Sequence, residues 1–154
     1  MRKEITCYGY ILNVLNKNDF SRKDLYLKAI NKGYLEPDVI EALDKLKLQG
    51  YQNDSRLAEN IVYFYSKTRG VNWIKQKLNQ KNLERDVIRT ALETYSNVDN
   101  SELERKVRSK YNIKDFTLMD QKQYTKLYSF LIYSGYDNVS QIIESFVSID
   151  RNIK

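Results

Sequence analysis

Apolar side chains recur every three or four positions along almost the whole chain, and this helical period constrains the fold most strongly. Only five Gly and one Pro occur among 154 residues, which favours long helices over many tight turns. Residues that end or start helices, such as Gly33, Gly50, Gly135 and Pro37, separate the periodic segments. The pattern predicts nine helices and no sheet.

Eight of the nine predicted helices have a buried stripe, and several have recognisable ends. Ser21 with Asp24, and Ser101 with Glu104, have the spacing of a capping box, in which both side chains satisfy free backbone amides. The predicted second helix ends at Gly33. The stripes are Ile5, Tyr8, Leu12 and Leu15; Val39, Ile40, Leu43 and Leu46; Leu57, Ala58, Ile61, Val62 and Tyr65; Val71, Ile74 and Leu78; Val87, Ile88, Ala91 and Leu92; Leu103 and Val107; Tyr124, Leu127, Tyr128, Leu131 and Ile132; Val139, Ile142, Ile143 and Phe146.

An internal repeat groups these helices in threes. The segment NKGYLEPDVI (31–40) aligns without gaps on NQKNLERDVI (79–88), with six of ten positions identical. The dipeptide Gly-Tyr also closes a predicted helix three times, beginning at residues 33, 50 and 135. We therefore predict an all-α, elongated tandem array of three three-helix modules, at 1–50, 51–97 and 98–154. Such an array offers a long face for an extended partner rather than a deep pocket.

The net charge of +6 is unevenly distributed. Residues 66–85 hold six basic and one acidic side chain, residues 86–104 hold one basic and five acidic, and residues 105–114 hold five basic and none acidic. Two basic blocks on either side of an acidic segment indicate separate cationic surfaces.

Several kinds of chemistry are disfavoured by what the chain lacks. It has no His and a single Cys, so zinc sites built from Cys and His, and imidazole acid–base catalysis, are excluded. Cys7 is interpreted as a small apolar residue on a helix. Neither a Gly-rich phosphate loop nor acids at metal-ligand spacing occur, so we expect no enzyme, no cofactor and no metal. No apolar run is long enough to span a membrane, which predicts a cytoplasmic protein, most simply a monomer.

The basic blocks supply the candidate binding residues. On a helical wheel, Trp73 lies outside the stripe of Val71, Ile74 and Leu78, and Lys77 and Lys81 lie beside it. An exposed aromatic among cations suits a protein or nucleic-acid interface, although Trp73 could instead pack against the next module. The candidates for a filament or nucleic-acid contact are Lys67, Arg69, Trp73, Lys77, Lys81, Arg105 and Arg108. Lys106 and Lys110 lie on the same flanks of the predicted helix as Arg105 and Arg108. The alternative for this second basic block is an ordinary helix face in contact with solvent.

The segment GYQNDSRLAENIVYF, followed by TRGVNWIKQKLNQKNLERDVIRTAL, resembles the bacterial RecX family of RecA regulators. The matching positions of the signature are Gly50, Asp54, Arg56, Ala58 and Gly70, together with Tyr51, Asn53, Ile74, Leu78 and the pair Val87-Ile88. The resemblance runs from about residue 19 to 92 and, more weakly, over 122–146. Two positions depart from the family pattern: Leu57 replaces the usual Phe, and Lys81-Asn82 replaces Lys-Gly.

The resemblance implies a non-catalytic regulator that binds the RecA–DNA filament, with DNA as a secondary partner. It implies inhibition of strand exchange, ATP turnover and co-protease activity, and hence roles in DNA repair and the SOS response. A stand-alone nucleic-acid-binding protein is the alternative. For the signature we expect mainly structural roles: Asp54 stabilises a helix start, and Arg56 bridges Asp54 or neighbouring modules, or contacts the filament.

Overall fold

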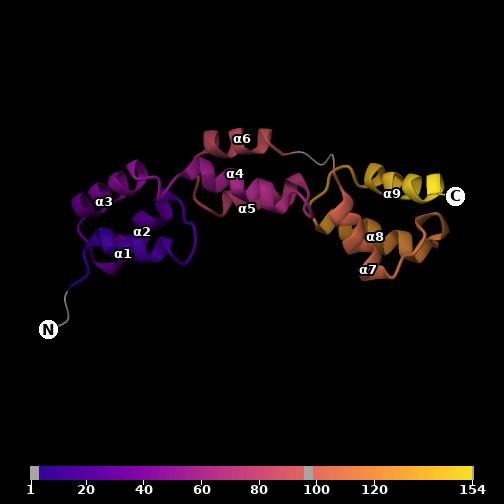
Figure 1. The fold of residues 1–154 in the computed structure, drawn as a ribbon, viewed down its shortest axis with the longest axis horizontal. Coiled ribbons are helices and arrows are strands. Elements are labelled where there is room, and N and C mark those ends of the chain that lie inside the picture. The colour runs from indigo at the N-terminus through magenta and orange to yellow at the C-terminus, as the bar shows by residue number, and fades with distance from the viewer. Residues whose placement is uncertain (1–3, 96–98, 154) are drawn as a thin grey trace. The chain divides into compact units, whose positions relative to one another are not determined.

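The computed structural model describes residues 4–95 and 99–153, and Figure 1 labels its helices. The predicted all-α class is confirmed, because these residues form nine α-helices, one 3-10 helix and no strand. The 3-10 helix η1 was not predicted. The elements are α1 (Cys7–Leu15), α2 (Arg22–Lys32), α3 (Glu36–Leu48), α4 (Asp54–Tyr65), α5 (Val71–Asn79), α6 (Arg85–Glu93), α7 (Ser101–Tyr111), η1 (Phe116–Leu118), α8 (Gln121–Tyr133) and α9 (Val139–Ile153).

The chain divides into two compact units. Unit 1 contains the described residues up to 61 together with 77–91, and unit 2 contains 62–76 together with the described residues from 92 onward. Helices α4 and α5 therefore each contribute to both units. The predicted limits of three modules stay a prediction, and the limit between residues 97 and 98 lies outside the described residues.

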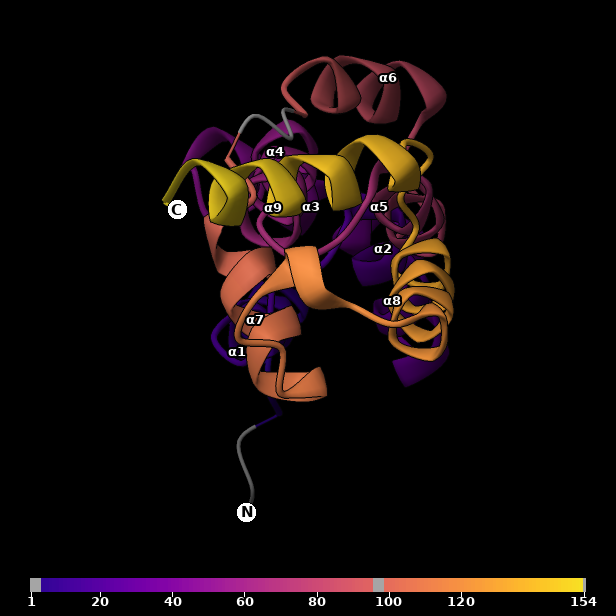
Figure 2. The same ribbon diagram turned by 90° about the vertical axis from the view of Figure 1, so that its right-hand side faces the viewer.

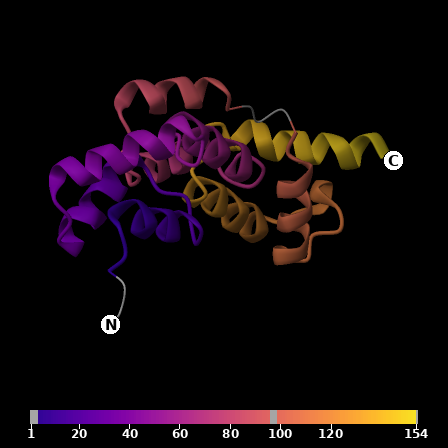
Figure 3. The ribbon, with the colours of Figure 1, turned by 60° about the vertical axis from the view of Figure 1, so that its left-hand side comes forward.

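The core of unit 1 lies among the first three helices, which contact one another pairwise (Figure 3). Two residues of the predicted stripes are exposed instead. Ile5 precedes the helix, whose N-cap is Thr6, and Ile40 lies on the outer side of α3, where Ala42 is buried in its place. The buried cluster consists of Cys7, Ile11, Leu25, Ala29, Val39, Ala42, Leu43 and Leu46.

The larger core of unit 2 lies among α7, η1, α8 and α9 (Figure 2). Phe116 of η1 is fully buried and stacks on Phe146 of α9, with ring centroids 5.1 Å apart. Tyr128 and Ile132, predicted as part of the α8 stripe, are exposed. The buried residues are Leu103, Val107, Ile113, Phe116, Leu127, Leu131, Tyr136, Val139, Ile142, Ile143 and Phe146.

The Gly-Tyr dipeptides that begin at residues 33, 50 and 135 end a helix with the same hydrogen bonds. In each, the Gly has a positive φ, its amide donates to the carbonyl three residues back, and the Tyr amide donates to the carbonyl five residues back. This is the Schellman arrangement, which satisfies carbonyls that the helix leaves free. Asn82 also has a positive φ, of 54°, so the departure from Lys-Gly preserves a left-handed turn.

The predicted helix starts are only partly correct. Ser21 caps α2 by accepting from the Asp24 amide, but the Asp24 carboxylate accepts from the Asn82 side chain at 2.6 Å instead of completing a capping box. The box predicted at Ser101 is wrong, because Asn100 is the N-cap and Ser101 is the first helical residue. A complete capping box occurs instead at Asp120 and Gln123, at the start of α8.

The two copies of the sequence repeat, both within unit 1, differ by one residue in structure. In the first copy the helix α3 begins at Glu36, and Val39 is buried while Ile40 is exposed. In the second, α6 begins one aligned position later, and the aligned Ile88 is the buried member of its pair. The repeat therefore preserves the helix but not the side chain that it buries.

Candidate binding surface

Residues 62–76 of unit 2 combine cations and aromatic rings without any acid. The Lys67 ammonium lies 5.2 Å from the centre of the Tyr63 ring, and the Arg69 guanidinium lies 4.8 Å from the centre of the Trp73 ring. Trp73 also packs on Tyr65, with ring centroids 4.7 Å apart. Such cation–ring contacts hold the long basic side chains against the surface rather than leaving them free.

The second basic block is arranged in the same way. On α7, the ammonium groups of Lys106 and Lys110 lie 5.8 Å and 4.7 Å from the centre of the Phe130 ring of α8. Phe130 in turn packs edge-on against Tyr111, with centroids 6.0 Å apart. This block therefore also presents cations on aromatic rings.

The structure brings these two blocks together. The pKa of Lys106 is lowered, first because neighbouring atoms exclude water from its ammonium and then because the charges of Arg69 and Lys110 repel it. Because like charges act on one another only at short range in salt solution, Arg69 and Lys106 belong to one surface. We call this surface the cationic–aromatic patch and define it as Arg69, Trp73, Lys106, Lys110 and Phe130.

The backbone beside Arg69 is held by a close contact. The amides of Gly70 and Asn72, at the start of α5, donate to the carbonyls of Ser134 and Gly135, at the end of α8, at 2.9 and 3.1 Å. Each helix end thereby satisfies backbone groups that the other leaves free. A Cβ atom on Gly70 would overlap the Gly135 carbonyl and the Tyr136 amide, which explains why this signature position is Gly.

Trp73 takes part in that contact. Its backbone lies against Gly135, where any side chain would overlap it, and its ring is half-buried under Arg69 and Tyr65. The alternative that Trp73 packs against the last predicted module therefore has structural support. An additional role in binding stays a prediction.

The other predicted candidates lie in different settings. Lys77 and Lys81 are half-buried and belong to unit 1, whereas Lys67, Arg69 and Trp73 belong to unit 2. Arg105 is exposed on α7. A binding role for these residues stays a prediction.

Arg108 forms an ion-pair network inside unit 2. Its guanidinium lies 2.8 Å from the Glu104 carboxylate and 2.7 Å from that of Asp150. The second Asp150 oxygen accepts from the Phe116 amide at 2.6 Å, so the network fixes η1 against α9. The pKa of Asp150 is lowered mainly by its hydrogen bond from Arg108. Arg108 thus has a structural role, and its predicted contact with a filament stays a prediction.

The signature residues near Gly50 make contacts within unit 1, and their mainly structural role stays a prediction. Asn53 caps α4 by accepting from the Arg56 amide, and the Asp54 carboxylate accepts from the Arg22 amide at 2.9 Å and from Gln52 at 2.7 Å. Asp54 therefore supports the first turn of α2 as well as its own helix. Ala58 is fully buried.

The surroundings of Arg56 differ from those expected if its side chain bridged to Asp54. Among residues 4–95 and 99–153, no ion pair joins it to Asp54. It is exposed, beside a small cavity that Phe20 and Leu57 also line.

The proximity of the two basic blocks was not predicted from the sequence. Lys106 and Lys110 were recognised as flanking cations, but Phe130 was not a candidate, because nothing in the sequence separates it from an ordinary core aromatic. The useful signal was the spacing of Lys106 and Lys110, which places both on one side of α7.

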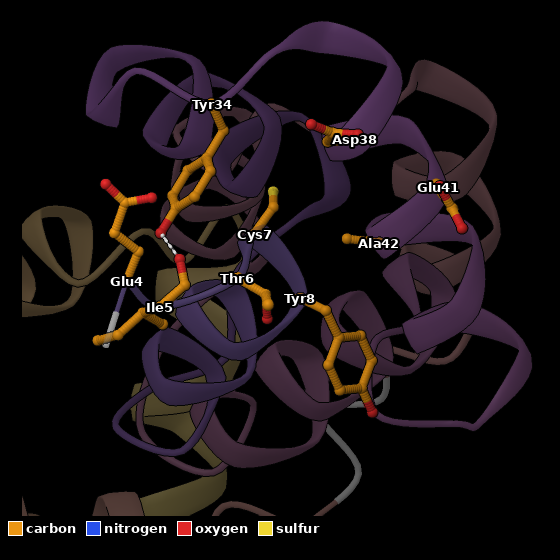
Figure 4. Close-up of a pocket in the computed structure, with 9 residues that line it drawn as sticks. All are labelled: Glu4, Ile5, Thr6, Cys7, Tyr8, Tyr34, Asp38, Glu41 and Ala42. Atoms are coloured by element: carbon orange, nitrogen blue, oxygen red, sulfur yellow. Dashed lines mark hydrogen bonds between the residues drawn. The ribbon is translucent and has the colours of Figure 1, made fainter. Parts of the chain in front are cut away.

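A separate pocket of about 440 Å³ lies in unit 1, beside Cys7 (Figure 4). The carboxylates of Glu4, Asp38 and Glu41 lie around it, and the Tyr34 hydroxyl donates to the Ile5 carbonyl at 2.8 Å across one side. Burial raises the pKa of the Cys7 thiol, and the Asp38 charge raises it further. The thiol is thereby kept protonated and weakly nucleophilic, in agreement with its place in the core.

In the ranges 4–95 and 99–153, no group of three or more acidic or Cys side chains is placed to hold a metal ion. No helix within these ranges is both long enough and apolar enough to cross a membrane.

Fold and surface together define an all-helical protein of short packed helices that presents cations on aromatic rings. Comparison with known proteins makes the assignment specific. The regulatory protein RecX of Vibrio parahaemolyticus is 33% identical over 127 residues, which cover 81% of this chain and 80% of that protein. RecX of Clostridium perfringens strain 13 is 30% identical over 138 residues, which cover 86% of this chain and 64% of that longer protein. The chain therefore belongs to the RecX family of regulatory proteins.

Solved structures agree on the fold. The crystal structure of RecX from Lactobacillus salivarius superposes with a TM-score of 0.71 at 22% identity, over 93% of this chain and 95% of that one. A second crystal structure of a regulatory protein RecX gives a TM-score of 0.68 at 23% identity, over 90% of this chain and 71% of that one. No protein-family model matches the chain.

Proposed function

We propose that this protein is a non-catalytic regulator that binds RecA assembled on DNA and inhibits its recombinase, ATPase and co-protease activities. The family assignment supports a regulatory role, and the resemblance to a family of RecA regulators supports RecA as the target. A regulator of recombination and of the SOS response works in the cytoplasm, where bacterial DNA lies. The protein acts as a monomer, with DNA as a secondary partner.

The observation that carries this proposal is the cationic–aromatic patch. Arg69 and Lys106 come from basic blocks separated by an acidic segment, yet they lie close enough to repel each other. Folding that gathers like charges costs free energy, which a polyanionic partner recovers when it binds. A nucleoprotein filament offers such a partner.

The proposal is tested by titrating the protein into a RecA ATPase reaction on single-stranded DNA. The informative variant is Lys106→Glu with Lys110→Glu, and the matched control is Lys122→Glu with Lys126→Glu. Both pairs are exposed, four residues apart on a helix of unit 2, and change the charge equally. We expect the first pair to raise the half-inhibitory concentration about tenfold, a loss of roughly 1.4 kcal/mol. We expect the control to change it little.

Equal loss in both pairs would show that only total charge matters and would contradict a defined patch. Unchanged inhibition in both would place the binding surface elsewhere. Helicity by circular dichroism confirms that each variant is folded.

The second candidate, a stand-alone nucleic-acid-binding protein, is favoured by the same cations and separated by one measurement. Strong binding to bare DNA at physiological salt, without any effect on RecA ATPase, would support it over RecA regulation. If the patch contacts phosphates, the logarithm of the affinity falls with the logarithm of salt by about 0.7–0.9 per phosphate neutralised. An affinity independent of salt would exclude phosphate contact.

A further inference from the structure

Two adjacent aromatic side chains of unit 2 are left in solvent by the fold. Tyr63 and Phe64, in the last turn of α4, are 70% and 69% exposed. The buried stripe of α4 lies on another face, and Tyr63 projects about 170° from its centre. Large rings that a helix leaves in water are typical of contact surfaces.

The immediate surroundings of the pair are cationic. Lys67 lies on the Tyr63 ring, and the stretch 62–76 carries three basic side chains and no acid. Phe64 contacts Tyr65 edge-on, with centroids 5.0 Å apart, and Tyr65 continues to Trp73 and Arg69 of the cationic–aromatic patch. A path of ring and cation contacts therefore runs from Phe64 to the patch, and Tyr63 with Lys67 lies beside it in the sequence.

The partner that matches this alternation is a single strand of nucleic acid. Unpaired bases stack on exposed aromatic rings whatever their sequence, while cations beside the rings meet the phosphates. A duplex hides its base faces, so it could contact only the basic side chains and not the rings. A protein partner of acidic character would likewise contact the cations and have little need of the two exposed rings.

We propose that Tyr63 and Phe64 form a base-stacking site for single-stranded DNA, which extends the cationic–aromatic patch. This inference rests on the proposed function, because it identifies which component of a nucleoprotein filament this end of the surface contacts. Lys67 supplies the adjoining phosphate contact. The site thereby distinguishes unpaired bases from phosphate charge alone.

The test compares two labelled strands of about 15 nucleotides, one oligothymidine and one abasic with the same phosphates. Binding of the full chain is followed by fluorescence anisotropy. The variant is Tyr63→Ser with Phe64→Ser. The control is Tyr51→Ser with Tyr133→Ser, which removes two other rings, 55% and 81% exposed. All these side chains are mainly in solvent, so the variants are expected to fold.

We expect the protein to bind oligothymidine about tenfold more tightly than the abasic strand. The Tyr63 and Phe64 variant should lose this preference while it retains its affinity for the abasic strand, and the control should keep both. Equal affinity of the unaltered protein for the two strands, or a preference that survives in the variant, would overturn the inference.

The RecA ATPase titration separates this outcome from the proposed function. A protein that inhibits RecA but shows no preference for bases retains its regulatory function and loses the stacking site. If the Tyr63 and Phe64 variant loses inhibition although the unaltered protein shows no base preference, the pair contacts RecA itself, and the inference is wrong. A base preference without RecA inhibition would uphold the stacking site and contradict the regulatory proposal.

Discussion

Gly70 shows how one residue can be recognised in the sequence for a reason that only packing reveals. It was expected as part of a family signature placed before a helix. In the structure its amide donates to Ser134, and the Gly135 carbonyl lies where a Cβ atom would stand. The sequence identified the position, but the partner lies 65 residues away and has no local signal.

We expect Gly70→Ala to lower the free energy of unfolding by about 3 kcal/mol or more, because neither backbone segment can move aside without breaking hydrogen bonds. Gly33→Ala is the comparison. A Cβ there meets nothing within 4 Å, so only the left-handed backbone resists it, at about 1–2 kcal/mol. Urea unfolding followed by circular dichroism measures both. A cost at Gly70 no greater than that at Gly33 would contradict the close contact.

At the scale of helices, the ends were predicted better than the contacts between them. The Gly-Tyr signals marked three helix ends correctly, because the left-handed turn is a local property of Gly. The start of α7 was misplaced by one residue, since Asp99, Asn100 and Ser101 all suit a helix start. Asp54 was rightly expected near a helix start, but its bond to the amide of Arg22 in α2 was not foreseen.

We expect Asp54→Ala to destabilise unit 1 by about 2 kcal/mol, because it leaves the Arg22 amide and Gln52 without their charged acceptor. Glu59→Ala, an exposed acid on the same helix, serves as the control and should change stability by less than about 0.5 kcal/mol. Thermal unfolding measures stability, and RecA ATPase inhibition is measured below the transition. Lost inhibition with unchanged stability would assign Asp54 to the binding surface instead.

The whole molecule has an unusual set of titrating groups. It contains no His, so no side chain has an ordinary pKa between 5 and 8. The pKa of Asp150 is lowered by Arg108, whereas burial raises that of Tyr95 to about 12 and also raises that of Tyr136. Stability is therefore expected to be nearly constant around neutral pH and to fall at both extremes.

Proton linkage gives the direction of the stability change at low pH, the acid limb of the curve of stability against pH, and at high pH, the alkaline limb. Because the folded pKa of Asp150 lies below its unfolded value of about 3.9, its stabilisation is present above that value and is lost as the pH falls through the folded pKa. Because Tyr95 stays protonated in the folded state while the unfolded chain ionises, stability falls as the pH rises from about 10 to about 12.

Urea unfolding across the pH range tests these limbs with one variant for each. We expect Asp150→Asn to be less stable at neutral pH by roughly 2 kcal/mol, below the 3–5 kcal/mol of a fully buried pair because Arg108 is 25% exposed, and to have a shallower acid limb. Tyr95→Phe should have a shallower alkaline limb. An acid limb unchanged in Asp150→Asn would show that other carboxylates govern acid unfolding.

The sequence by itself determined the all-helical class, several helix ends, the family and the uneven charge, because periodicity, caps and composition are properties of neighbouring residues. The tertiary structure decided which side chain of each repeat is buried, why Gly70 has no side chain, and that Arg69 and Lys106 share a surface while Arg108 is held in an ion-pair network. Those outcomes depend on contacts between residues far apart in the chain, and helical spacing alone carries no record of which faces will meet.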